Sequence, residues 1–142
     1  MATIPGPGSV LFLCEYNSCR SQIAEGLART LAPGGVTVYS AGFRKSAVHP
    51  LAHAVMAEIG IDLSGQVSKT IAEVPLQEIG LVVTLCDPAV GACPPLPPGA
   101  RHLHWPCSDP TRAAGGPDAV LQAARVVRDN LTAKLKTLWP QA

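Results

Sequence analysis

Short apolar runs recur along the chain and predict where the strands of a sheet lie. Residues 9–13 and 81–85 read SVLFL and LVVTL, with no alternation of apolar and polar positions. Such runs are typical of strands that are buried on both faces of a parallel sheet. Residues 36–41 predict another strand, and residues 101–105 predict a short fourth one.

Amphipathic stretches separate these runs and predict helices. In residues 20–31 and 117–138, apolar side chains recur at a spacing of three or four positions, which places them on one face of a helix. Residues 50–59 predict a further helix that begins at a proline and ends before a glycine cap. Shorter helical pieces are expected at 68–73 and 75–78.

Strands that alternate with helices favour an α/β fold, because parallel strands are joined by crossover helices. We therefore predict a three-layer sandwich, with a four-stranded parallel sheet and helices on both faces. The length of 142 residues fits one domain over residues 1–142. Ligands of such folds bind at the carboxyl ends of the strands, so candidate chemistry is sought there.

Composition and charge exclude several classes of protein. Hydrophobic residues make up 47% and charged residues 15%, so the chain is not disordered. A net charge of +1, with no cluster of basic residues, argues against nucleic-acid binding. The apolar runs are far shorter than the roughly 20 residues that a membrane helix needs. Residues 1–9 carry no positive charge, so we expect no secretory signal and a cytoplasmic protein.

The cysteines carry most of the chemical information. There are five of them, at positions 14, 19, 86, 93 and 107, and an odd number without an export signal does not indicate a disulfide framework. The spacings also differ from the close pairs of structural zinc sites, although four cysteines could still converge in space. A sensor or binding module for soft metals therefore stays open beside a catalytic or redox role.

The segment from Cys14 to Ser21 joins a predicted strand to a predicted helix. A loop in this place directs backbone N–H groups inward, and the helix dipole adds partial positive charge, which together make an anion cradle. Arg20 can hold two oxygens of the anion, and Cys14 lies where a thiolate is favoured. Ser21 can donate a hydrogen bond to the Cys14 sulfur. The expected substrate-binding residues are Glu15, Tyr16, Asn17, Ser18, Cys19, Arg20 and Ser21.

This C-x5-R-S loop resembles that of the low-molecular-weight protein tyrosine phosphatases and of their relatives, the thioredoxin-coupled arsenate reductases. Asn17 and the later pair Asp109-Pro110 also match the pattern of this family. The resemblance implies the phosphatase-type α/β fold over nearly the whole chain. It also implies that Cys14 is the nucleophile and that Asp109 is the general acid for the leaving oxygen.

A second segment distinguishes the two branches. Leu81–Cys86, which reads LVVTLC, and Cys93 with the following Pro94 resemble the redox segment of the thioredoxin-coupled arsenate reductases. The resemblance implies that arsenate is reduced to arsenite through a relay from Cys14 to Cys86 to Cys93, which thioredoxin then regenerates. A mycothiol or glutathione reductant stays open. Weak phosphatase activity is expected beside the reductase activity.

The alternative enzyme is a low-molecular-weight tyrosine phosphatase whose extra cysteines only protect it from oxidation. In that branch a tyrosine usually follows the Asp-Pro pair, whereas Thr111 follows it here. Glu15 is unusual in either branch, because a carboxylate beside an anion site repels the substrate unless it points outward. Nothing in the sequence requires more than a monomer.

We expect no metal site and no tightly bound cofactor. Asn17, Glu25 and Ser40 resemble positions that hold a potassium ion in some reductases, but Lys69 stands where an acidic residue is usual. This lysine makes the ion doubtful, and its ammonium group is a candidate to replace it. The histidines at positions 49, 53, 102 and 104 are interpreted as structural or surface groups.

Overall fold

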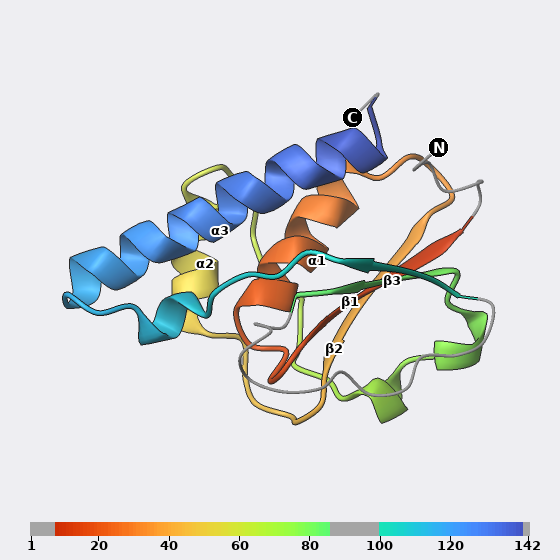
Figure 1. Ribbon diagram of the computed structural model, residues 1–142, viewed down its shortest axis with the longest axis horizontal. Helices are drawn as coiled ribbons and strands as arrows, with labels where there is room; N and C mark the ends of the chain where they lie inside the picture. The colour runs from red at the N-terminus through yellow and green to blue at the C-terminus, as the bar shows by residue number, and fades with distance from the viewer. Residues whose placement is uncertain (1–7, 86–99, 141–142) are drawn as a thin grey trace.

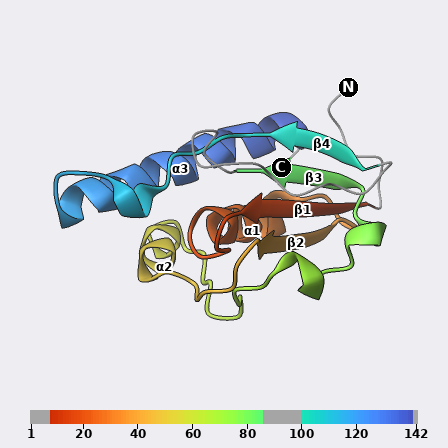
Figure 2. The same cartoon turned by 60° about the horizontal axis from the view of Figure 1, so that its bottom comes forward.

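The strands are the part of the structure that positions the candidate site. The computed structural model describes residues 8–85 and 100–140. Within these residues, four parallel strands form one sheet (Figure 1), and Figure 2 shows their order β2-β1-β3-β4. The strands are β1 (Ser9–Cys14), β2 (Thr37–Gly42), β3 (Leu81–Thr84) and β4 (Arg101–His104). The predicted parallel α/β sheet is therefore confirmed, with strand ends that differ by one residue from those expected.

The central strands β1 and β3 are buried on both faces, which explains their unbroken apolar runs. In β1, the side chains of Val10 and Phe12 enter a core on one face, and those of Leu11 and Leu13 enter a second core on the other. Side chains alternate between the faces of a strand, so only a continuously apolar strand can fill two cores. β1 pairs with both β2 and β3 and thus lies at the centre of the sheet.

Helices cover the two faces unequally in the described residues. The helices α1 (Arg20–Leu31), α2 (Pro50–Ala57) and α3 (Pro117–Leu138) pack on one face (Figure 2). The 3-10 helices η1 (Ile71–Glu73) and η2 (Leu76–Glu78) contribute to the core on the other face. The three layers of the prediction are present, and the bounds of α1 and α3 are those expected. α2 is two residues shorter than the predicted helix at 50–59.

An ion cluster that the sequence pattern did not indicate joins α2 to α3. Glu58 accepts hydrogen bonds from Arg125 and Arg128, which lower the pKa of its carboxyl group to about 2. The Arg128 side chain is buried, and its guanidinium also donates a hydrogen bond of 2.8 Å to the Val55 carbonyl. This cluster holds the end of α2 against α3.

The carboxyl ends of the strands meet at one edge of the sheet, as expected for a ligand site. β1 ends at Cys14, and β2 ends beside it at Gly42. The continuation of β3 beyond Leu85 contains Cys86 and Cys93, which both lie outside the described residues. None of the described helices is long and apolar enough to cross a membrane.

Candidate active site

The loop between β1 and α1 is held in place by contacts from two other segments. The Glu15 carbonyl accepts hydrogen bonds from the backbone N–H groups of Phe43 and Arg44, and Ser68 Oγ donates to the Tyr16 carbonyl. Asn17 has a φ of 49°, in the left-handed region that asparagine tolerates better than most residues. The shape of the loop is therefore fixed by hydrogen bonds from residues distant in the sequence.

Cys14 lies at the base of this loop, almost completely buried. Its Sγ is 2.8 Å from Ser21 Oγ, in the first turn of α1. Asn17 Nδ2 donates to the same Ser21 hydroxyl at 2.7 Å. Because Asn17 donates to Ser21, the Ser21 proton is free to point at the sulfur and stabilise a thiolate. The expected contact between Ser21 and Cys14 is therefore present.

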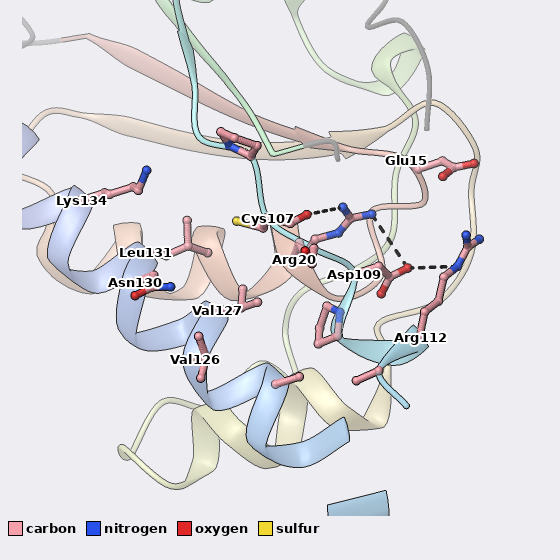
Figure 3. A pocket seen from close by; sticks show the side chains of 15 residues that line it. Glu15, Arg20, Cys107, Asp109, Arg112, Val126, Val127, Asn130, Leu131 and Lys134 are labelled. Atoms are coloured by element: carbon pink, nitrogen blue, oxygen red, sulfur yellow. Dashed lines mark hydrogen bonds and ion pairs between the residues drawn. The ribbon is translucent and has the colours of Figure 1, made fainter. Parts of the chain in front are cut away.

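Arg20 begins α1 and lies beside the loop with its side chain buried. Its Nη1 donates to the carbonyl of Cys107 at 2.9 Å and lies 3.4 Å from that of Leu85. Its Nη2 is 4.0 Å from Asp109 Oδ2 (Figure 3). The guanidinium is thus anchored by carbonyl groups that follow β3 and β4.

Asp109 is fixed by the short helix that it caps, η3 (Pro110–Arg112). Its Oδ1 accepts hydrogen bonds from the backbone N–H and the hydroxyl of Thr111, at 3.0 Å and 2.7 Å. Its Oδ2 lies between two guanidinium groups, 4.0 Å from Arg20 and 3.7 Å from Arg112. The Asp-Pro pair therefore forms a turn that aims the carboxylate at Arg20.

These groups surround a cavity of about 260 Å³ above Cys14. Of the expected residues, Cys14, Tyr16, Ser18, Cys19, Arg20 and Asp109 line this cavity. The side chains of Asn17, in the loop, and Ser21, in α1, are buried and hydrogen-bonded to each other, and they do not line the cavity. Glu15 lines a neighbouring cavity of about 680 Å³, and Figure 3 shows its carboxylate pointing away from Arg20. This orientation answers the objection that Glu15 would repel an anion.

Two further thiols near the site are held in the protonated form. Burial, together with the negative charges of Asp109 and Cys14, raises the pKa of the Cys19 thiol to about 12. Burial raises the pKa of the Cys107 thiol to about 11, against the opposing effect of Arg20. Since the thiolate is the reactive form of cysteine, both are poor nucleophiles at neutral pH.

A buried polar network extends from the loop to Lys69. Asn17 Nδ2 donates to Ser40 Oγ at 2.9 Å, and the Ser40 hydroxyl donates to Glu25 Oε1. Lys69 Nζ lies 3.5 Å from the same Glu25 oxygen, and the Lys69 backbone N–H donates to Asn17 Oδ1 at 2.8 Å. Arg29 binds the other oxygen of Glu25.

This network does not fit a bound potassium ion. The Glu25 carboxylate already has the Lys69 ammonium on one oxygen and the Arg29 guanidinium on the other. A further cation beside Lys69 would meet like charge, and like charges at close range repel each other. The position of the Lys69 ammonium beside Glu25 therefore supports the expectation that it replaces the potassium ion.

Some residues at the cavity were not predicted as site residues. Ser46, His49, Thr111 and Arg112 line it. His49 Nδ1 accepts a hydrogen bond from the Leu51 backbone N–H and so caps α2, which leaves its proton on Nε2 when the ring is neutral. The sequence places His49 directly before a helix-starting proline and Arg112 three positions after Asp109, but neither signal indicates that these residues reach the cavity.

Comparisons with known proteins agree with this geometry. Residues 9–137 match the family described as low molecular weight phosphotyrosine protein phosphatase. An arsenate reductase of Halalkalibacterium halodurans is 43% identical over 128 residues, which are 90% of this chain and 92% of that protein.

Solved structures of similar proteins include further arsenate reductases. A structure described as an arsenate reductase in the phosphate binding state is 36% identical, with a TM-score of 0.77, over 94% of this chain and 98% of that one. The thioredoxin-dependent arsenate reductase of Corynebacterium glutamicum is 26% identical, with a TM-score of 0.71, over 98% of this chain and 66% of that one.

Proposed function

The chain belongs to the low-molecular-weight phosphotyrosine protein phosphatase family, and we propose that within this family it is an arsenate reductase. The observation that carries the proposal is the cavity in which Cys14 Sγ lies 2.8 Å from Ser21 Oγ, with Arg20 and Asp109 on its wall. The similar proteins described above that are named arsenate reductases support it further.

In the first step, the Cys14 thiolate attacks the arsenic atom of arsenate. A sulfur–arsenic bond forms, and one arsenic–oxygen bond breaks. Arg20 stabilises the charge on the remaining oxygens, as a bidentate guanidinium does for tetrahedral anions. We assign the proton of the leaving water to Asp109, which lines the same cavity as Cys14. The loop residues Tyr16, Ser18 and Cys19 hold the anion, and the buried hydrogen bond between Asn17 and Ser21 supports the loop.

In the second step, thiols supply the two electrons of the reduction. The Cys86 thiolate attacks the Cys14 sulfur, a disulfide forms, and the electron pair of the sulfur–arsenic bond stays with arsenic, which leaves as arsenite. The Cys93 thiolate then attacks Cys86 and releases the Cys14 thiolate. Both Cys86 and Cys93 lie outside the described residues, so their part in the proposal rests on the sequence.

At the end of the relay, the protein holds a Cys86–Cys93 disulfide, which a dithiol protein must reduce before the next turnover. We propose thioredoxin as this reductant, and the thioredoxin-dependent relative of Corynebacterium glutamicum supports the choice. The cycle needs thiols that are kept reduced, which fits a cytoplasmic enzyme.

The proposal is tested by a coupled assay with arsenate, thioredoxin, thioredoxin reductase and NADPH. We expect turnover by the wild type, and at least a hundredfold loss in each of Cys14→Ser, Cys86→Ser and Cys93→Ser, since each removes one thiol of the relay. Cys107→Ser is the matched control and should keep most of the activity. Full activity of Cys86→Ser or Cys93→Ser would show that the relay is wrong.

An aryl phosphate distinguishes the two branches of the family in the same preparations. Hydrolysis needs the nucleophile and not the relay. Slow phosphate release should therefore survive in Cys86→Ser and disappear in Cys14→Ser. Steady phosphate release by the wild type without any arsenate turnover would instead identify a phosphatase.

A further inference from the structure

A second arginine lies at the cavity above Cys14, outside the family loop. Arg112 is the last residue of η3, and its side chain is 65% exposed. It lines both the cavity of about 260 Å³ and the neighbouring cavity of about 680 Å³. Its Nε lies 3.7 Å from Asp109 Oδ2, which is too long for a hydrogen bond and therefore marks a loose ion pair.

The charges that line the cavity show why this arginine matters. Before Asp109 takes up the proton that it later gives to the leaving oxygen, the anionic groups on the wall are the Cys14 thiolate and the Asp109 carboxylate, and the cationic groups are Arg20 and Arg112. Without Arg112 the wall would carry a net negative charge. Arsenate is itself an anion near neutral pH, so it would be repelled by such a wall. Arg112 brings the wall to neutrality before the substrate adds its own charge.

The two arginines are also held differently. Arg20 is buried, and its Nη1 donates to the Cys107 carbonyl at 2.9 Å, so its position is fixed. Arg112 is mostly exposed and has a loose contact to Asp109, so its guanidinium can move toward an incoming oxyanion. Thr111 keeps Asp109 in place through Oδ1 when Arg112 leaves Oδ2.

We infer that Arg112 is an oxyanion-capture residue: it exchanges its ion pair with Asp109 for an oxygen of the substrate as the anion enters the cavity. Arg20 then holds the anion for the attack by Cys14. The inference rests on the proposed function for the identity of the substrate as arsenate. The capture itself applies to any tetrahedral oxyanion, including inorganic phosphate.

The test uses the full chain and two readouts. The first is the dissociation constant of inorganic phosphate, measured by how strongly phosphate protects the Cys14 peptide from iodoacetamide. The second is the steady-state kinetics of arsenate reduction at several salt concentrations. In Arg112→Gln we expect the dissociation constant of phosphate and the KM for arsenate each to rise about tenfold, while kcat changes less than about twofold. The reason is that a charge at the rim of the cavity acts on association more than on the chemical step.

Two further variants separate capture from a structural role. Arg112→Lys keeps the charge and should restore most of the phosphate affinity. Lys136→Gln removes one positive charge from the exposed last turn of α3, away from both cavities, and should bind phosphate like the wild type. The salt dependence of kcat/KM should become weaker in Arg112→Gln and stay unchanged in Lys136→Gln.

Each result has a defined meaning. The capture role would be overturned if the dissociation constant of phosphate in Arg112→Gln stays within twofold of the wild type, even if arsenate is reduced normally. A tenfold weaker phosphate affinity in a protein that does not reduce arsenate would uphold the capture role and refute the proposed function. A loss confined to kcat, with an unchanged KM, would also overturn the inference.

Discussion

Glu25 is a buried carboxylate whose partners connect the surface to the catalytic loop. Its side chain is 2% exposed, and burying a charge is costly unless the charge is paired. Lys69 and Arg29 pair it, and the Ser40 hydroxyl links it to Asn17, which in turn contacts Ser21 beneath Cys14. The ammonium of Lys69 is thus part of the support of Cys14, the proposed nucleophile.

We predict that Lys69→Met lowers the free energy of unfolding by about 1–3 kcal/mol, because it leaves one oxygen of a buried carboxylate without its cation. Urea denaturation measures this change. Lys45→Met is the matched control, since Lys45 pairs with Glu73 at 3.4 Å on the surface and such pairs contribute roughly 0–1 kcal/mol. Equal losses in both variants would contradict a special role of Lys69.

From the contact between Lys69 and Glu25 we also predict how the enzyme responds to monovalent cations. Wild-type turnover should be equal in potassium and sodium chloride at one ionic strength, because Lys69 already supplies the positive charge. Strong activation by potassium over sodium would mean that an ion binds despite the lysine, and it would refute this account of Glu25.

At the scale of elements, the end of β2 supports the loop that follows β1. Gly42 pairs with Cys14, and a Cβ atom on Gly42 would lie 2.6 Å from the Asn17 backbone nitrogen and 2.7 Å from the Tyr16 carbonyl carbon. Real Cβ atoms do not approach backbone atoms so closely. Only glycine lets the two elements approach to the distance that the loop needs.

We therefore predict that Gly42→Ala displaces the loop and weakens oxyanion binding. Overpacking of this kind costs typically about 1–3 kcal/mol, and we expect a roughly tenfold or larger loss in kcat/KM. Gly34→Ala is the matched control, because no atom lies within 4 Å of a Cβ at that position. If both variants keep wild-type kinetics, the contact between β2 and the loop does not hold the site.

The elements were predictable where the pattern is periodic. The bounds of α1 and α3 follow from apolar positions spaced along one face, and β1 and β3 follow from unbroken apolar runs. The buried Arg128 was not predicted, because its partner Glu58 is far from it in the sequence and the pairing depends on how α2 meets α3.

The site was predictable only in its local part. The contact between Cys14 and Ser21 follows from a loop directly before a helix, as does the place of Arg20. Arg112 and His49 reach the cavity from segments whose approach is set by tertiary packing, so local spacing did not reveal them. The roles of Cys86 and Cys93 stay predictions, since both lie outside the described residues.

At the scale of the whole molecule, the parallel sheet gathers the chemistry at one edge. Cys14 is the last residue of β1, and Asp109 comes after β4. The topology thus accounts for how residues nearly a hundred positions apart in the sequence serve one cavity. β3, which Cys86 follows in the sequence, lies next to β1 in the sheet order, and the proposed relay relies on this arrangement.

The most direct test of this account is a map of the disulfides after a single turnover with arsenate in the absence of thioredoxin. Alkylation and mass spectrometry of the trapped protein identify which cysteines are oxidised, and the released arsenite is counted in the same sample. The account predicts one Cys86–Cys93 disulfide for each arsenite, with Cys14 and Cys107 still reduced. Release of arsenite while Cys86 and Cys93 remain free thiols would contradict it.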